Sequence, residues 1–321
     1  MALYIDCVLP KNILQLCTQD TWRQISQYLL ARANITSRPK VSETKLWFDL
    51  LDIPWMEKIP TAALTGLADQ LNIAKDYWLR ADPKNLVVKG AQFFDQPFLF
   101  NELNVKKIAV ALEKLRTLFS DYLITLHTPC FDRWYLSMPF DPSLETEDIA
   151  ALQQGISTAK WLGERLNPQS SAYIPWKKLF TEVQMLLHQA ELPFNSLWFW
   201  GGGFLPAPSI VRQHHNISPI VKKVWSNVPL IKGLASLKND FVDQNLQNWK
   251  QTITRFSSDQ QCLFIFESPS NEEMLHFFQE LVEMLKTHNI NKLRLHDGQG
   301  HVYSSTPYTI RRFWRYTIPT I

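Results

Sequence analysis

The chain has 321 residues, of which 45% are hydrophobic and 20% are charged, and its formal net charge at pH 7 is +3. This composition is ample for a sizeable core and excludes a disordered chain. The near balance of charge argues against a protein whose main partner is nucleic acid. No apolar run approaches the roughly 18 residues of a membrane-spanning helix, so no membrane span is expected.

The N-terminal segment and the cysteines indicate a cytoplasmic protein. Asp6 and Lys11 interrupt the first apolar run and no basic region precedes it, which is not the pattern of a signal peptide. The four cysteines are scattered and form no Cys-x-x-Cys pair, so neither a zinc ribbon nor a disulfide framework is expected. We expect them to be reduced and mostly buried.

Hydrophobic periodicity predicts helices that alternate with strands. In chain order, we expect a strand at residues 3–9, helices at 21–33, 104–119 and 176–189, strands at 195–200 and 262–266, and a helix at 271–287. Prolines indicate loops at 138–142 and 203–208. Residues 292–296 and 301–305 predict a hairpin around a turn at 297–300, and 311–316 a further strand.

The pattern of the strands indicates the fold class. The segments 195–200 and 262–266 are apolar on both alternating faces, which is typical of a central strand in a sheet that is covered by helices. Alternating helices and strands predict an α/β fold with a mostly parallel central sheet and helices on both faces. No linker marks a boundary, so residues 1–321 are expected to form a single α/β unit.

Five short blocks stand out in the sequence. They are WLRADP at 78–83, RWYL at 133–136, EVQMLLH at 182–188, NSLWFWGGG at 195–203 and RRFWR at 311–315. In identity and order, these blocks resemble the RpfE-type regulatory proteins, a bacterial family often labelled phosphoglycerate mutase-like. That family is similar, more distantly, to the cofactor-independent phosphoglycerate mutases. The resemblance therefore implies an alkaline-phosphatase-like α/β fold, whereas function must be argued from the site.

Two of these blocks contain polar or flexible groups that suit an anionic ligand. Arg80 and Asp82 share one face of a predicted strand, where they either pair with each other or present a fork to an anion. The glycines at 201–203 follow a buried strand, either as a tight turn or as a backbone loop that faces a ligand. We expect Arg80 to lie close to these glycines. The candidate ligand-binding residues are Arg80, Asp82, Arg133, Gly201, Gly202 and Gly203.

The catalytic set of a metal-dependent mutase is incomplete. Such enzymes place a Ser or Thr nucleophile beside two divalent ions that several Asp and His residues hold. The resemblance places a metal-binding Asp in an Asp-Gly context after the first strand, but Asp6 is not followed by glycine. His296, Asp297 and His301 could hold a transition metal if the hairpin brings them together. Asp-Gly is also a turn former in its own right, and then these residues only build the hairpin.

The sequence favours a non-catalytic regulatory or interaction protein on a phosphoglycerate-mutase-like scaffold, with no cofactor. One alternative is a phosphoryl-transfer enzyme, a mutase or phosphatase, that would require manganese or zinc. Another is a protein that binds a small anionic metabolite. A protein partner or such a metabolite is expected, and nucleic acid is not. Basic side chains beside aromatic rings can stack bases, but Arg311, Arg312 and Arg315 are more typical of a solvated edge.

Overall fold

The chain forms two compact units in the computed structural model. The structure describes residues 3–9, 20–73, 75–98, 104–142, 144, 146–157, 175–207, 223–238, 241–243, 249, 260–265, 267, 270–313 and 315. Unit 1 comprises Met1–Trp55 and Ala207–Ile321, and unit 2 comprises Met56–Pro206. The sequence predicts one unit, but no described strand of one unit pairs with a strand of the other. Among the described helices, none combines the length and apolarity that crossing a bilayer requires.

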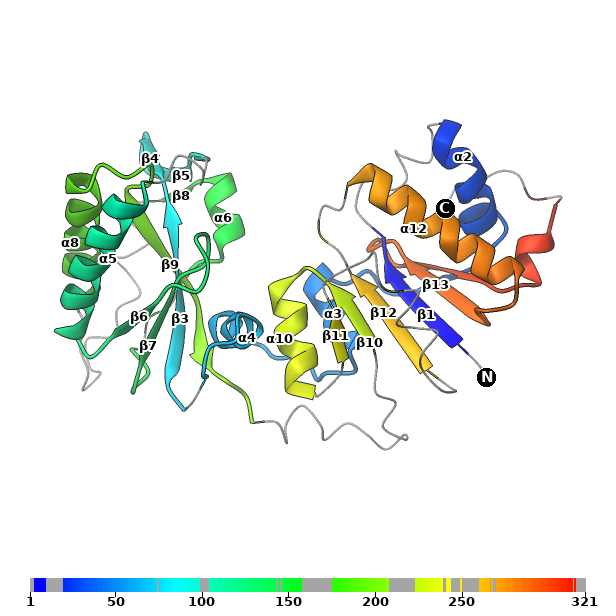
Figure 1. The fold of residues 1–321 in the computed structure, drawn as a ribbon, viewed down its shortest axis with the longest axis horizontal. Coiled ribbons are helices and arrows are strands. Elements are labelled where there is room, and N and C mark those ends of the chain that lie inside the picture. Colours follow the sequence, from blue (N-terminus) through cyan, green and yellow to red (C-terminus); the bar gives the residue numbers. More distant parts are fainter. Residues whose placement is uncertain are drawn as a thin grey trace. The chain divides into compact units, whose positions relative to one another are not determined.

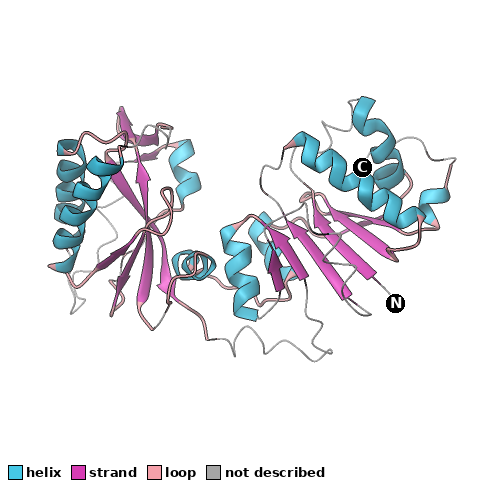
Figure 2. Ribbon diagram, in the orientation of Figure 1, coloured by secondary structure: helices cyan, strands magenta, loops and turns pink. Residues whose placement is uncertain are grey.

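Unit 1 is built on a seven-stranded sheet with the order β11-β10-β12-β1-β13-β14-β2 (Figures 1 and 2). Its strands are β1 (Leu3–Val8), β2 (Asn34–Ser37), β10 (Lys223–Ser226), β11 (Phe241–Asp243), β12 (Gln260–Ile265), β13 (Lys292–His296) and β14 (His301–Ser305). The pairings from β11 to β13 are parallel, and β14 pairs antiparallel with β13 and β2. The mostly parallel central sheet and the C-terminal hairpin are therefore confirmed in this unit.

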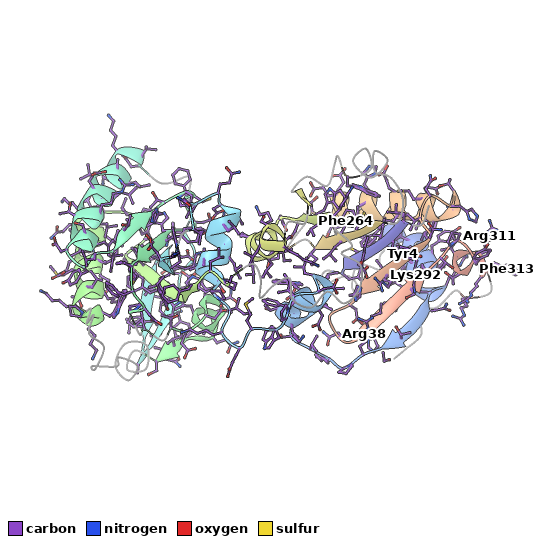
Figure 3. All side chains as sticks on the ribbon, turned by 90° about the horizontal axis from the view of Figure 1, so that it is seen from below. Tyr4, Arg38, Phe264, Lys292, Arg311 and Phe313 are labelled. Atoms are coloured by element: carbon purple, nitrogen blue, oxygen red, sulfur yellow. The ribbon has the colours of Figure 1, made fainter. Side chains whose placement is uncertain are left out.

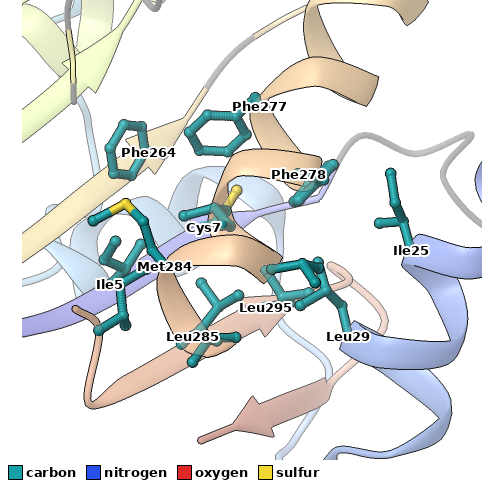
Figure 4. Close-up of a cluster of buried hydrophobic side chains, with 14 of the residues drawn as sticks. Ile5, Cys7, Ile25, Leu29, Phe264, Phe277, Phe278, Met284, Leu285 and Leu295 are labelled. Atoms are coloured by element: carbon teal, nitrogen blue, oxygen red, sulfur yellow. The ribbon is translucent and has the colours of Figure 1, made fainter. Parts of the chain in front are cut away.

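Helices cover unit 1 and close its core. They are α2 (Asp20–Ser26), the π-helical turn η1 (Gln27–Ala31), α3 (Glu43–Leu50), α10 (Pro229–Lys238), α12 (Asn271–Lys286) and the 3-10 turn η4 (Thr309–Arg311). Figure 1 shows α12 and α2 over one face of the sheet. On that face, alternate side chains such as Ile5, Cys7 and Leu295 pack against Phe277 and Phe278 of α12 (Figure 4). This packing follows from the period-two alternation of strands and the 3.6-residue period of the helix.

The opposite side chains of β1 and β13 form a polar face. Register places Tyr4 beside Lys292 and Asp6 beside Arg294, so these four side chains point to the same side of the sheet. Tyr4 is 41% exposed and Lys292 is partly exposed, and Figure 3 shows the two together. This part of the sheet is therefore apolar on one face and polar on the other, and it is on the polar face that Asp6 lies.

Unit 2 consists of two antiparallel sheets with helices around them. Its strands are β3 (Tyr77–Lys84), β4 (Leu86–Lys89), β5 (Gln92–Asp95), β6 (Thr125–His127), β7 (Tyr135–Met138), β8 (Ile156–Ser157) and β9 (Ser196–Phe204). The larger sheet has the order β6-β7-β3-β9, and the smaller has the order β4-β5-β8. The helices are α4 (Thr61–Ala68), α5 (Val105–Ser120), α6 (Ile149–Gln154) and α8 (Trp176–Gln189).

Two predictions from the sequence need correction here. The apolar strand at 195–200 is buried as expected, but it belongs to β9 at the edge of an antiparallel sheet. It is buried on both faces because α4 and α8 both pack against it, so two-faced apolarity did not require a central parallel position. No strand is found among the described residues of the predicted range 311–316, because Arg311 ends η4 and residues 312, 313 and 315 are not in a strand; residues 314 and 316 lie outside the described residues.

The main helices agree closely with the sequence. The predicted helices at 104–119, 176–189 and 271–287 correspond to α5, α8 and α12. Asn104 caps α5 by accepting from two backbone amides, and Ser270 caps α12 in a reciprocal capping box with Glu273. Side-chain caps therefore support α5 and α12, whereas α8 begins after Pro175 without one and rests on its amphipathic period.

Candidate functional site

The buried carboxylate of Asp6 is the centre of a polar group in unit 1 that we call the Asp6 cluster; its other members are Gln261, Arg294 and His296. His296 Nε2 donates to Asp6 Oδ1 at 2.8 Å. Arg294 Nη2 and Gln261 Nε2 donate to Asp6 Oδ2 at 2.6 Å and 2.8 Å. The three donors come from β12 and β13, the two strands that flank β1. Parallel register thus surrounds one carboxylate with donors from both sides.

The electrostatics of the Asp6 cluster are those of an internally neutralised anion. Burial raises the pKa of Asp6, but the hydrogen bonds from His296 and Arg294 and the positive charge of Arg294 outweigh burial and bring the pKa down to about 2. Asp6 is therefore ionised at neutral pH, and the permanently charged guanidinium of Arg294 balances it. The cluster has no net charge left with which to attract a cation.

The ring of His296 is held in one orientation. Since a carboxylate can only accept, Nε2 carries the proton that points to Asp6. Its other nitrogen, Nδ1, is buried and finds no hydrogen-bond partner in the part of the chain that the structure describes. The proton on Nε2 and the buried position of Nδ1 together fix how the ring lies against Asp6.

In unit 2, Arg80 and Asp82 of β3 form a buried ion pair. Arg80 donates to both oxygens of Asp82, with contacts of 2.7–2.9 Å, and its Nη1 donates to Thr65 Oγ1 at 3.2 Å. Trp200 Nε1 donates to Asp82 Oδ2 at 2.7 Å, and the guanidinium lies 5.1 Å from the rings of Trp200 and Tyr135. Burial raises the pKa of Asp82, although Arg80 and Trp200 oppose that shift. The ion pair is buried by its neighbours, and the guanidinium donates to Asp82 and Thr65 instead of facing a ligand.

Arg133, just before β7, belongs to a second pair beside the same sheet. Its Nε and Nη2 donate to the two oxygens of Asp69 at 2.9 Å each, and the hydroxyl of Tyr135 donates to the same carboxylate. Burial raises the pKa of Asp69, but Arg133 and Tyr135 outweigh it and lower the pKa overall. Because Tyr135 also lies beside Arg80, the two pairs adjoin on one face of the sheet. Arg133 is thus committed to a protein carboxylate.

The three glycines continue β9 instead of forming a turn or a loop. Register places Arg80 opposite Trp200 and Trp78 opposite Gly203, so Arg80 does lie close to the glycines. Gly201 has a φ of 65°, which a residue with a side chain rarely adopts. A Cβ at Gly203 would come within 2.7 Å of Pro60, just before α4. The glycines therefore allow close packing within unit 2.

The C-terminal hairpin separates its two histidines. His296 pairs with Val302 and bonds to Asp6, whereas His301 Nδ1 lies 2.8 Å from Asp297 Oδ2. Asp297 Oδ1 also accepts from the backbone amides of Gln299 and His301, as turn-forming aspartates do. Within the described ranges, no three His, Cys, Asp or Glu side chains gather in a way that could hold a metal ion.

The sequence singled out some of these residues and missed others. The blocks at 78–83, 133–136 and 195–203 lie on three neighbouring strands, β3, β7 and β9, of one sheet. Asp69, Gln261 and Arg294 were missed because their partners are distant in the chain. Arg294 could have been found from the alternation of polar and apolar residues in Lys-Leu-Arg-Leu-His at 292–296. In a strand, this alternation places Arg294 and His296 on the same face.

Comparison with known proteins gives a fold and no family. No family model matches the sequence, and no curated protein matches it. The structure is similar to PH0037 protein from Pyrococcus horikoshii, at 10% identity and a TM-score of 0.53, over 95% of this chain and 87% of that chain. It is also similar to the cofactor-independent phosphoglycerate mutase from Thermoplasma acidophilum DSM 1728, at 14% identity and a TM-score of 0.49, over 96% and 90% of the two chains.

These likenesses differ in what they support. The likeness to PH0037 shows a shared overall fold across nearly the whole chain and nothing about activity. The score against the mutase is too low to carry a conclusion. The resemblance to RpfE-type proteins is not confirmed by these comparisons.

Proposed function

We propose that this chain is a regulatory or interaction protein on a phosphoglycerate-mutase-like scaffold, and that it does not transfer phosphoryl groups. One observation carries the proposal: both oxygens of Asp6 are occupied by protein donors, one of them the guanidinium of Arg294. A protein of this kind acts by binding a partner.

The chemistry of phosphoryl transfer explains why this observation matters. Metal-dependent mutases and phosphatases need an anionic ligand set that holds manganese or zinc beside a nucleophile. In the Asp6 cluster, Asp6 and His296 are the groups that could serve as ligands. Arg294 lies 2.6 Å from Asp6 and would repel a divalent ion placed there. These residues do not fit a divalent metal, so no catalytic step is derived through one.

The proposal is tested by assaying the purified full chain for mutase and phosphatase activity with added Mn²⁺ or Zn²⁺. We expect no turnover above background. Asp6→Asn is the control, because activity that depends on the Asp6 cluster should be lost in that variant. A turnover of about 1–1,000 per second that Asp6→Asn abolishes would contradict the proposal.

A titration sharpens the role of Arg294. Isothermal titration of Mn²⁺ into the native chain should show no binding, whereas Arg294→Ala removes the positive charge beside Asp6 and should bind the ion weakly. Arg294→Lys keeps the charge and should behave like the native chain. Mn²⁺ binding to the native chain that Asp6→Asn removes would show that the guanidinium does not exclude the metal.

A further inference from the structure

Five basic side chains gather in unit 1, in a surface that we call the basic corner: Arg32, Lys286, Arg311, Arg312 and Arg315. Arg32 and Lys286 both lie over the ring of Tyr28. They come from segments far apart in the sequence, and hydrogen bonds hold these segments together. Arg32 Nη1 donates to the carbonyl of Ile310 at 2.6 Å, and Arg315 Nη1 donates to the carbonyl of Ala33 at 3.3 Å. The corner is therefore built by the fold and is more than a run of arginines near the chain end.

No carboxylate among the residues that the structure describes pairs with an arginine of the basic corner. Each of its arginines is bonded to a backbone carbonyl, a side-chain amide oxygen or a histidine ring. Among the described residues, the carboxylate paired with the corner is Glu283, at 2.7 Å from Lys286. Positive charges that lie together repel one another when their partners are mostly neutral, and a polyanion relieves that repulsion.

Aromatic rings lie among these cations. Tyr308 is 77% exposed and Phe313 is 67% exposed. Tyr308 contacts the ring of His288 at a centroid distance of 6.4 Å, and His288 in turn contacts Arg311. The amide of Phe313 donates to the carbonyl of Arg311, and Figure 3 shows these two side chains at the same end of the unit. Two exposed aromatic side chains thus lie in the same C-terminal segment as the arginines of the corner.

We propose that the basic corner binds single-stranded nucleic acid. Guanidinium groups would contact phosphates, and the exposed rings of Tyr308 and Phe313 would stack bases, which is the combination that single-strand-binding surfaces use. An acidic peptide would satisfy the charge but would leave two exposed rings without a role.

Net charge concealed this surface in the sequence. Lysine and arginine outnumber aspartate and glutamate in unit 1, while the acidic residues outnumber the basic ones in unit 2. The net charge of +3 is the sum of a positive unit 1 and a negative unit 2. The expectation against nucleic acid was based on this sum, which does not report the local charge at the basic corner.

The experiment measures fluorescence anisotropy of a labelled oligo(dT) of about 16 nucleotides with the full chain at several salt concentrations. Tyr308→Ala should weaken binding at least about fivefold, which is the lower limit for loss of one stacked base. Arg311→Glu should weaken binding and reduce the slope of log K against log salt by about 0.7 per lost phosphate contact. Both side chains are exposed, so the fold should survive in each variant.

Matched controls come from unit 2. Lys114→Glu reverses an exposed charge on α5, and Phe131→Ala removes a ring that is 63% exposed. Both should bind as the native chain does. Absence of salt-dependent binding would overturn the proposal, as would equal losses in the controls or equally strong competition by poly-glutamate. This assay does not involve the Asp6 cluster, so it can fail while the proposed lack of catalysis stands, and the reverse also holds.

Discussion

The two units differ in how far their buried carboxylates and the paired arginines are shielded from solvent. In unit 2, the Arg80–Asp82 pair is almost wholly enclosed, with side-chain exposures of 6% and 2%. In unit 1, Asp6 is fully buried, but the side chain of Arg294 is 31% exposed. A sealed pair depends on both partners, because neither can reach water when the other is removed. A pair with one exposed partner can rearrange, and the same substitution should therefore cost less.

The largest effect is expected from Arg80→Ala. Removing the guanidinium leaves Asp82 buried without its counterion, which typically costs about 3–5 kcal/mol of unfolding free energy. Urea unfolding of the native chain and the variant measures this. The double variant Arg80→Met/Asp82→Leu removes both charges and should recover most of the loss. A single variant as stable as the native chain would show that the pair is not sealed.

A smaller effect is expected from Asp6→Asn. The substitution keeps the shape but removes the charge that Arg294 and His296 bond, which is worth about 1.5–3 kcal/mol for hydrogen bonds to a charged group. Arg294 can turn toward solvent, so the loss should stay below that of Arg80→Ala in the same urea experiment. If Asp6→Asn costs more than Arg80→Ala, the contrast between the two units is reversed.

The difference between the native chain and Asp6→Asn should depend on pH. The pKa of Asp6 is about 2 in the folded chain, whereas it is about 3.9 when unfolded. A lowered folded-state pKa contributes stability that is fully present above pH of about 4 and is lost as pH falls through about 2. The advantage of the native chain should therefore shrink by about 2.6 kcal/mol across this window. Asp69, whose pKa is also lowered, titrates in both proteins and cancels in the difference.

The smallest effect is expected at an exposed pair. Arg116 lies 2.7 Å from Glu113 on α5, and their side chains are 44% and 74% exposed. Solvent screens such pairs, so Arg116→Ala should change the unfolding free energy by less than about 0.5 kcal/mol. A loss comparable to that of Asp6→Asn would mean that burial does not set the order of these effects.

Local signals in the sequence were enough for much of the fold. The cap at Ser270 and the apolar stripe of α12 predict that helix correctly, and the Asp-Gly turn predicts the hairpin. The strand direction of β9 was not predictable, because its two apolar faces are equally consistent with a parallel or an antiparallel neighbour. The insertion of unit 2 was also missed. The only local traces at its crossings are prolines such as Pro54 and Pro206, which occur in ordinary loops too.

The candidate site was harder to predict than the fold. Arg80 and Asp82 were correctly placed on one face of a strand, and pairing was one of the two alternatives that the sequence left open. The donors around Asp6 could not be found, because Gln261 and Arg294 reach it only through the order of strands in the sheet. A site whose side chains come from distant segments can be predicted only when the order of the strands in the sheet is known.

The insertion of unit 2 has a consequence for how the chain is made. Ile5 pairs with Cys262 and Leu293, so β1 leaves the ribosome long before the strands on either side of it exist. At typical translation rates the delay is on the order of tens of seconds. Unit 2 is continuous in the chain and can complete its sheets during that interval. Nascent β1, with apolar residues and free backbone edges, is therefore the segment that a chaperone would have to protect during synthesis.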